Sequence, residues 1–379
     1  MKPWVVVAGD FTPLGGMDVA NLALARHLAR RGDQVHVVAH RVWSDLEQLP
    51  GIVVHHVWRP LGRHLLGSPL LARKGQRVWN SLRDSGARAV VNGGNCPLAD
   101  VNWVHYLHAA FAPKAAGSPS RRAKQAFTHE RDVAAERRAL CGARVVICNS
   151  ERTRRDVVER HGLDESCVHV VYYGSDTHRL ALVDAAARRA AREKLGWPLD
   201  RPVVGFVGAL GDRRKAFDTV FEAWISLCRT RDWDADLAVV GSGAELPRWR
   251  ERASSSGFGD RIRFLGFRDD VPFILSALDG FVHPARYEAY GLSVHEAVCR
   301  GIPAIVSASS GVAERYPADL HQLLIANPDN PGELAERLRY WRSNHGWLAE
   351  VVRPLSDALR SHTWDAMASE IVRKVEQAA

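Results

Sequence analysis

The feature that most constrains the fold of this chain is an alternation of short β-branched segments with stretches of helical periodicity. Strands that alternate with helices in this way form parallel sheets with crossover connections. The predicted strands are 4–8, 35–39, 52–57, 89–92, 102–106, 144–148 and 169–172 in the first half, and 203–207, 236–240, 262–265, 280–283, 304–307 and 323–325 in the second. The pattern therefore predicts an α/β fold that restarts at residue 203.

The length of the chain agrees with a restart of the fold. Its 379 residues are too many for one ordinary core and suit two domains of roughly 150 to 200 residues each. Between the two sets of strands, residues 180–195 form an Ala/Arg-rich segment with helical periodicity, which ends at Gly196 and Pro198. We predict two Rossmann-like domains with a boundary near residue 176.

The composition is that of a globular protein, with 46% hydrophobic and 25% charged residues. No apolar run approaches the roughly 20 residues that a membrane-spanning helix needs, and residues 1–10 lack the apolar core and cleavage site of a signal peptide. The six cysteines contain no C-x-x-C pair, as is typical of reduced core thiols. We therefore expect a cytoplasmic protein without disulfides and without a metal site.

The positive charge of the chain is unevenly placed. Residues 1–175 contain 24 Lys and Arg against 15 Asp and Glu, whereas the remainder contains 27 against 28. The bases gather in 58–79 and 114–138, where they mix with leucines or other apolar residues. Such segments can lie on an anionic membrane or bind an anionic or lipid-linked acceptor, although a solvated arginine-rich face would give the same pattern. No nucleic-acid-binding motif accompanies the charge, so we expect no nucleic-acid partner.

Residues 284–307 combine two carboxylates with a glycine turn and the start of a helix. Glu288 precedes the turn at Gly291, and Glu296 follows about a turn and a half into the predicted helix. A helix that opens there directs unpaired N–H groups and its positive dipole end at a phosphate. The groups concerned belong to Tyr290, Gly291 and Leu292. We predict a nucleotide-sugar site in which Glu288 accepts hydrogen bonds from sugar hydroxyls and Glu296 faces the same ligand.

The spacing from Glu288 to Glu296, with His283-Pro284 before it and 301–303 after it, resembles the E-x7-E signature of the family 4 retaining glycosyltransferases. That resemblance covers nearly the whole chain. It implies the GT-B fold, in which two Rossmann-like domains face each other across a cleft and the last helix crosses back to the first domain. On this basis, the N-terminal acceptor domain would be 1–175 plus 364–379, and the C-terminal donor domain 176–363. Residues 362–367 resemble the element at that crossing.

A cation cluster follows the strand 203–207 and precedes a helix. The three cations are Arg213, Arg214 and Lys215. Facing a diphosphate, they would stabilise the charge that grows as the nucleotide leaves. They resemble the family's arginine/lysine pair, but Ala209 replaces the arginine usual after Gly208, and Ala216 replaces the glycine usual after the lysine. The resemblance thus assigns a catalytic role to Lys215 and leaves the arginine role to Arg213 or Arg214. A solvated basic turn is the alternative.

Near the N-terminus, Gly15 and Gly16 follow the first strand and open the helix 18–31, where paired glycines let the backbone approach a ligand closely. The loop resembles the family's first-strand glycine loop, which closes over the donor diphosphate and the acceptor. Because the three-glycine spacing is missing and no acidic residue closes the strand 35–39, a dinucleotide-binding dehydrogenase is disfavoured. Taken alone, the glycine pair could equally be structural.

Two histidines are candidates for the active site. The strand 102–106 brings His105 to its carboxyl end, where sites of α/β proteins lie, and His108 follows in the loop. The resemblance implies a histidine at this strand end that hydrogen-bonds the transferred sugar. We favour His105 and keep His108 open, and a core histidine with a satisfied bond remains the structural alternative.

Three shorter segments support the same family. Residues 147–153 resemble its interdomain serine loop and point to Ser150, whereas 170–176 resemble its strand-to-hinge element with Tyr173 in place of the usual asparagine. Residues 239–245 look like its second glycine turn. Phe267 and Arg268 stand in a segment that resembles the loop whose backbone contacts the base. Each segment alone is also compatible with an ordinary turn.

The resemblance implies a retaining transferase that moves a sugar from a nucleoside-diphosphate sugar to an acceptor hydroxyl of a glycan, glycolipid or small molecule, with no cofactor. No D-x-D element follows a strand, since residues 232–236 precede one, so no metal is expected. Two alternatives remain. One is a nucleotide-sugar epimerase of the same fold. The other is a degenerate, non-catalytic binding subunit, which Ala209 and Ala216 favour and Glu288, Glu296 and Lys215 oppose.

Overall fold

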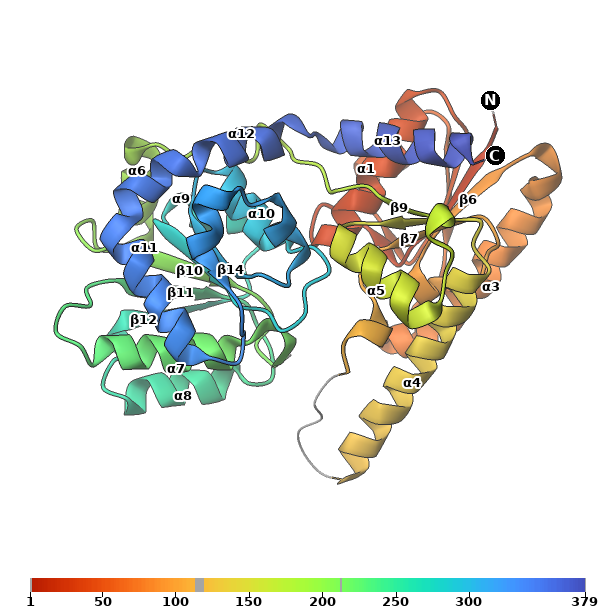
Figure 1. Ribbon diagram of the computed structural model, residues 1–379. Coiled ribbons are helices and arrows are strands. Elements are labelled where there is room, and N and C mark those ends of the chain that lie inside the picture. The colour runs from red at the N-terminus through yellow and green to blue at the C-terminus, as the bar shows by residue number, and fades with distance from the viewer. Residues whose placement is uncertain (1, 113–118, 212, 379) are drawn as a thin grey trace. The chain divides into compact units, whose positions relative to one another are not determined.

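The computed structural model describes residues 2–112, 119–211 and 213–378. The chain forms two compact units, Met1–Gly174 with His362–Ala379, and Ser175–Ser361 (Figure 1). Each unit is built on one parallel sheet with helices on both faces. The predicted α/β architecture with two Rossmann-like units is therefore confirmed.

In the described part of the first unit, a seven-stranded sheet has the order β5-β3-β1-β6-β7-β8-β9, and every pair is parallel. Its strands are β1 (Trp4–Val7), β3 (Val35–Ala39), β5 (Ile52–His56), β6 (Arg88–Asn92), β7 (Val101–Val104), β8 (Val145–Cys148) and β9 (Val168–Val170). A separate short pair, β2 (Asp10–Phe11) and β4 (Arg41–Val42), extends beyond β1 and β3 and had no counterpart in the prediction.

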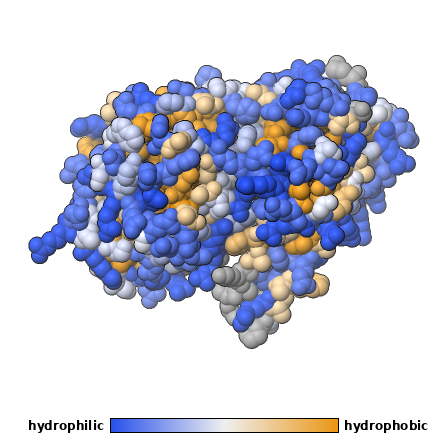
Figure 2. Space-filling view, viewed as in Figure 1, coloured by the Kyte–Doolittle hydropathy of each residue, from blue (hydrophilic) through white to orange (hydrophobic). Residues whose placement is uncertain are grey.

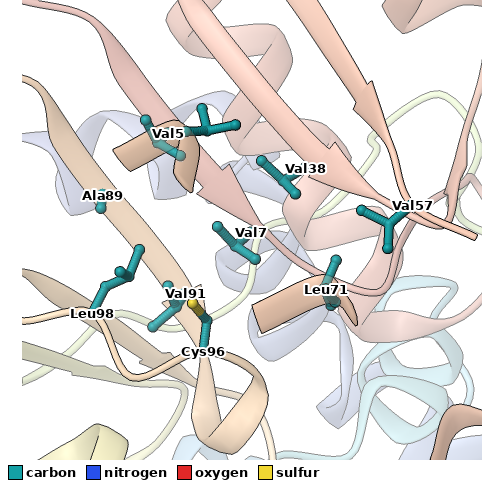
Figure 3. Packing of buried hydrophobic residues seen from close by; sticks show 10 residues of the cluster. Val5, Val7, Val38, Val57, Leu71, Ala89, Val91, Cys96 and Leu98 are labelled. Carbon is teal, nitrogen blue, oxygen red and sulfur yellow. The ribbon is translucent and has the colours of Figure 1, made fainter. Parts of the chain in front are cut away.

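Helices cover both faces of this sheet. They are α1 (Gly16–Arg30), α2 (Ser44–Glu47), α3 (His64–Leu82), α4 (Pro119–Cys141), α5 (Glu151–His161) and α13 (Trp364–Gln377). Helices α1 and α13 pack together on one side, and α3, α4 and α5 lie on the other (Figure 1). On the α3 side, Val5 and Val7 of β1 pack with Val91 of β6, Leu71 of α3 and Cys96 (Figure 3). Burial of such β-branched side chains is what selects these segments as strands.

The described part of the second unit contains a six-stranded parallel sheet with the order β12-β11-β10-β13-β14-β15. Its strands are β10 (Val203–Val207), β11 (Asp236–Val240), β12 (Ile262–Gly266), β13 (Gly280–His283), β14 (Ala304–Ser307) and β15 (Leu324–Ile325). Counted along each unit, both sheets have the doubly wound order in which the strand sequence reverses beside the first strand. The points of reversal lie between β1 and β6 and between β10 and β13.

The helices of the second unit follow the same alternation. They are α6 (Ala185–Leu195), α7 (Phe217–Cys228), α8 (Leu246–Ser255), α9 (Val271–Ser276), α10 (Leu292–Cys299), α11 (Pro331–Val351) and α12 (Arg353–Ser361). Helix α6 begins at residue 185 rather than at the predicted residue 180, because the Asp184 carboxylate accepts a hydrogen bond from the Ala187 N–H and caps the helix there.

The face shown in Figure 2 is mainly hydrophilic, with hydrophobic side chains in groups between the polar ones. Within the residues that the structure describes, no helix is both long enough and apolar enough to cross a membrane.

Candidate functional site

The point of reversal in the second unit brings together the two loops that carry the predicted cation cluster and Glu288. Strand β10 ends at Val207 and leads into Gly208 and the cation cluster, and β13 ends at His283 and leads into Glu288. Because the two strands are parallel neighbours, both loops leave the same edge of the sheet. Ligands of doubly wound folds bind at such edges.

The loop after β10 is held against the loop after β11 by backbone contacts. The Gly208 N–H donates to the Val240 carbonyl at 3.0 Å, and the Leu210 N–H donates to the Ser242 carbonyl at 2.9 Å. Gly241 has φ 148°, and a Cβ on it would lie 1.9 Å from the Gly208 carbonyl oxygen. Glycine is therefore required at residue 241 for the two loops to approach.

Lys215, Arg214 and His283 surround the Glu288 carboxylate. The Lys215 Nζ donates to Glu288 Oε2, and the Arg214 Nη1 lies 3.7 Å from the same oxygen. His283 Nε2 lies 3.1 Å from it and 3.5 Å from Lys215 Nζ. The structure thus brings the predicted Arg214 and Lys215 to Glu288, which stands 74 and 73 positions later in the chain. His283, which the sequence analysis noted only as a flanking residue of the motif, joins the same cluster.

This cluster keeps Glu288 ionised. Burial alone would raise the pKa of the Glu288 carboxyl, but Lys215, His283 and Arg214 outweigh burial and hold that pKa well below its usual range. Burial, together with the Lys215 charge, lowers the pKa of His283. The site therefore offers one carboxylate and two cations beside a neutral imidazole.

Arg286 ties the cation cluster to the loop that carries Glu288. Its guanidinium forms two hydrogen bonds of 2.9 Å to the Asp218 carboxylate and one of 2.5 Å to the Arg213 carbonyl. The backbone N–H of Arg286 donates to the Arg214 carbonyl at 2.8 Å. Burial would raise the pKa of Asp218, but the Arg286 charge lowers it. Arg286 was not predicted, because it stands 68 residues from Asp218 and no local pattern marks the contact.

Helix α10 begins at the predicted glycine turn. Gly291 has φ 112°, a left-handed conformation that favours glycine, and it precedes the first helical residue, Leu292. The Val312 N–H donates to the Tyr290 carbonyl at 2.8 Å and holds the turn. The Tyr290 side chain is buried, and its hydroxyl lies 2.8 Å from His295 Nδ1. The turn thus directs its tyrosine inward and is itself buried, with Leu292 as the first partly exposed residue after it.

Glu296 lies on α10, half buried, within the electrostatic reach of Arg179 and Arg300. Burial raises the pKa of its carboxyl to about 7, and the two arginines lower it only in part. Phe267 and Arg268 follow β12. The Phe267 ring is 71% exposed, and Arg268 forms hydrogen bonds of 2.6 and 2.7 Å with the Asp270 carboxylate.

In the first unit, His105 stands just after β7 and is nine-tenths buried. Its Nδ1 lies 2.5 Å from the Tyr173 hydroxyl, and its backbone carbonyl accepts a hydrogen bond of 3.1 Å from the Asn149 amide. Ser150, the next residue, caps α5, because its Oγ accepts from the Thr153 N–H at 3.0 Å. Burial lowers the pKa of His105 to about 3, so its imidazole is neutral.

His108 lies in a short 3-10 turn (His108–Ala110) that a buried carboxylate holds. Glu136 of α4 accepts hydrogen bonds from the His108 N–H at 2.6 Å and the Ala109 N–H at 3.1 Å. The same carboxylate lies 3.0 Å from His161 Nε2. Glu136 was not predicted, because its helical surroundings resemble an ordinary charged helix.

The glycine loop of the first unit has acidic neighbours. Gly15 precedes α1 with φ 90°, and Gly16 is its first residue. The Asp18 carboxylate accepts a 3.4 Å hydrogen bond from Thr12, and burial together with the nearby Asp10 raises the pKa of Asp18 to about 7. Asp10 itself pairs with Arg41 at 2.7 Å and Arg59 at 2.5 Å.

Comparison with known proteins matches each unit to a glycosyltransferase family. Residues 14–179 match the family described as Glycosyltransferase Family 4, and residues 187–353 match the family described as Glycosyl transferases group 1. A 2-deoxystreptamine N-acetyl-D-glucosaminyltransferase of Streptomyces fradiae is 30% identical over 84% of this chain and 81% of its own length. The chain belongs to the family 4 glycosyltransferases.

Further relatives support this assignment. A D-inositol 3-phosphate glycosyltransferase of Salinispora tropica is 28% identical over 94% of this chain and 80% of its own length. Among solved structures, WaaG, a glycosyltransferase involved in lipopolysaccharide biosynthesis, has a TM-score of 0.79 at 22% identity, with 97% of this chain and 99% of that chain covered. HepE of Anabaena, in complex with UDP and glucose, has a TM-score of 0.74 at 19% identity, with 100% of both chains covered. These structures show that this glycosyltransferase has the GT-B fold.

Proposed function

We propose that this glycosyltransferase transfers a sugar, with retention of anomeric configuration, from a nucleoside-diphosphate sugar to an acceptor hydroxyl. In this proposal the second unit binds the donor and the first unit binds the acceptor. The observation that carries it is the cluster of Lys215 and Arg214 around Glu288 at the carboxyl edge of the sheet. A relative of the same fold holds UDP and glucose, which supports a diphosphate donor.

The cluster supplies the two functions that such a transfer needs. A cation about 4 Å from a phosphate oxygen contributes a few kcal/mol at an effective dielectric near 20, so Lys215 and Arg214 would stabilise the leaving diphosphate. Arg213 would assist from the same turn. Glu288, which stays ionised, would accept hydrogen bonds from the hydroxyls of the transferred sugar.

The proposed mechanism is a front-face displacement. The acceptor oxygen forms its bond to the anomeric carbon on the side from which the diphosphate leaves, and a phosphate oxygen takes the hydroxyl proton. Glu288 is held by Lys215 and does not act as the nucleophile of a double displacement. Glu296 would bind the ribose, and the N–H groups of residues 290–292 would contact the diphosphate. We propose that no metal takes part.

The acceptor proposal draws on the relatives. Two of them are named for D-inositol 3-phosphate and for 2-deoxystreptamine, both of which are rings that carry several hydroxyl or amino groups. We propose a ring of this kind as the acceptor. Turnover with inositol phosphate but not 2-deoxystreptamine would favour the anionic acceptor, and the reverse would favour a cationic one.

A lipid-linked acceptor is a second candidate, favoured by one exposed surface of the first unit. Trp58 is 74% exposed and Leu61 is 81% exposed, and Arg63 follows them at the start of α3. Of the other basic segment, 114–138, residues 114–118 lie outside the described residues. Sedimentation with anionic liposomes at low salt tests this candidate, with a Trp58→Ala, Leu61→Ala variant as the control. If the protein stays in the supernatant, no peripheral membrane contact is made.

A thermal-shift screen against UDP, GDP, ADP and TDP and their common sugars tests the donor proposal, because a ligand that binds only the folded state raises the melting temperature. We expect a shift with one nucleotide, which Lys215→Ala abolishes. No shift with any nucleotide would favour the non-catalytic scaffold. Release of an epimerised sugar without acceptor would favour the epimerase.

A further inference from the structure

Asn149, Thr153 and Tyr173 form a chain of side-chain hydrogen bonds next to His105 in the first unit. The Asn149 amide faces the His105 carbonyl at 3.1 Å, and a carbonyl only accepts, so the NH2 group of Asn149 must point there. The same NH2 group lies 3.1 Å from the Tyr173 hydroxyl oxygen. On its other side, Asn149 Oδ1 accepts from the Thr153 hydroxyl at 2.8 Å. The Asn149 amide therefore donates to Tyr173.

This donation makes the Tyr173 hydroxyl an acceptor from Asn149. The same oxygen lies 2.5 Å from His105 Nδ1, so the hydroxyl hydrogen can be donated to that nitrogen. The two rings are nearly parallel, with an interplanar angle of 12°. In a neutral imidazole one nitrogen accepts and the other carries the hydrogen. With Nδ1 as the acceptor from Tyr173, the hydrogen of His105 stands on Nε2.

The Nε2 atom has no hydrogen-bond partner within the described residues and is buried. Its surroundings on the sheet are polar. The Trp103 ring centroid lies 4.3 Å from that of His105, and Asn92 pairs with Trp103 across β6 and β7. The Trp103 indole N–H and the Asn92 amide are likewise buried without a partner among the described residues. A buried unpaired polar group costs about 1–3 kcal/mol, so these groups are placed for a polar occupant.

We propose that Tyr173 is a positioning residue that holds His105 as the Nε2–H tautomer, so that His105 donates a hydrogen bond to a ligand oxygen and does not act as a base. This inference rests on the proposed function for the identity of that ligand, a sugar or polyol. Tyr173 stands where the family resemblance predicts asparagine. The Trp364 ring, 6.0 Å from that of Tyr173, packs against the tyrosine.

The tautomer can be measured without any donor or acceptor. In nitrogen-15 NMR of histidine-labelled protein, we expect His105 to show a protonated Nε2 and an unprotonated Nδ1 from pH 6 to 8. In Tyr173→Phe, which removes only the hydroxyl, the two tautomers should mix. Tyr316→Phe is the matched control, because it removes another buried tyrosine hydroxyl, which donates to the Ala304 carbonyl at 3.0 Å in the second unit. A protonated Nδ1 in the unsubstituted protein would overturn the proposal.

Substitutions of His105 separate a donor from a base. Glutamine places its N–H group near the position of Nε2, and asparagine places its own near Nδ1. We expect His105→Gln to keep at least tenfold more turnover than His105→Asn, and Tyr173→Phe to lower kcat about tenfold with the donor KM nearly unchanged. Equal loss in both His105 variants would contradict the donor role. If the enzyme proves inactive, the proposed function fails, while the NMR result still decides the tautomer.

Discussion

The two units share one strand order but carry opposite chemistry at the same place in it. At the carboxyl end of the first strand, the second unit places Lys215 and Arg214 around a carboxylate. The first unit places Asp10 and Asp18 near its glycine loop, with Asp10 neutralised by arginines. The doubly wound topology thus determines where a ligand binds, and the side chains determine which ligand.

In the first unit, the charge near the glycine loop differs from the charge of the unit as a whole. The first 175 residues carry the excess of positive charge, yet their glycine loop has acidic neighbours. A phosphate there would lie beside Asp18, with the two nearby arginines already paired to Asp10, whereas the second unit sets Lys215 and Arg214 beside Glu288. Under the proposed function, the diphosphate would therefore lie with the second unit, and a hydroxyl or amino group of the acceptor with the first.

Removal of a charge from each unit is expected to give the largest contrast. Lys215→Ala should weaken UDP binding about 100-fold, because it removes a cation worth a few kcal/mol and leaves Glu288 less neutralised. Asp18→Ala should change UDP affinity by less than about threefold. Calorimetric titration measures both, and Lys194→Ala, an exposed lysine on α6, is the control. An equal loss of UDP affinity in the Lys215 and Asp18 variants would contradict the assignment of UDP to the second unit.

The next largest difference between the units is expected for Arg286 and Arg59, each of which pairs with an aspartate near its loop. Arg286→Ala removes the two hydrogen bonds that Arg286 donates to the half-buried Asp218 and should cost about 2–3 kcal/mol of stability. Because the cation cluster is released as well, UDP affinity should fall about tenfold. Arg59→Ala removes one of the two arginines that pair with Asp10 and should destabilise the protein without weakening UDP binding. Thermal melts with and without UDP measure both effects.

Much of the fold could be predicted because its signal is local. Strands β10 and β11 match the predicted ranges, since a strand buried on both faces is a continuous apolar run. The E-x7-E spacing and the cation cluster were visible for the same reason. Contacts between distant residues were not visible. Tyr173 could be recognised as a departure from the family, but its partner His105 stands 68 residues away, and only the folded sheet brings them together.

Two carboxyls with similarly raised pKa values, one in each unit, sharpen the comparison further. Burial raises the pKa of Asp18 and of Glu296 to about 7. Between its ordinary pKa near 4 and about 7, each group binds more protons in the folded state than in the unfolded state, so it lowers stability as the pH rises through that window. Asp18→Asn and Glu296→Gln should each stabilise the protein at pH 8, by roughly 1 kcal/mol after discounting for partial exposure.

Below about pH 4 neither substitution should raise the melting temperature appreciably, because both carboxyls are then protonated in the unfolded as well as the folded protein. The effect on UDP binding should distinguish Glu296 from Asp18. Glu296→Gln should weaken UDP binding, if Glu296 binds the ribose, whereas Asp18→Asn should leave it unchanged. A gain in stability below pH 4 equal to that at pH 8 would contradict the raised pKa values.

The smallest expected effect concerns Ala216, which follows the cations directly. It precedes α7 with φ 52° and ψ 38°, a left-handed conformation that costs an L-residue about 1 kcal/mol. Ala216→Gly should relieve this strain and lose part of the gain to the greater freedom of the unfolded chain, leaving a stabilisation of about 0.5 kcal/mol. Ala223→Gly, within α7, should instead destabilise by about 1 kcal/mol. Because the strain adjoins Lys215, a gain in stability without a change in UDP affinity would show that the family's glycine serves the backbone here and not the ligand, whereas equal destabilisation by both substitutions would exclude the left-handed conformation at Ala216.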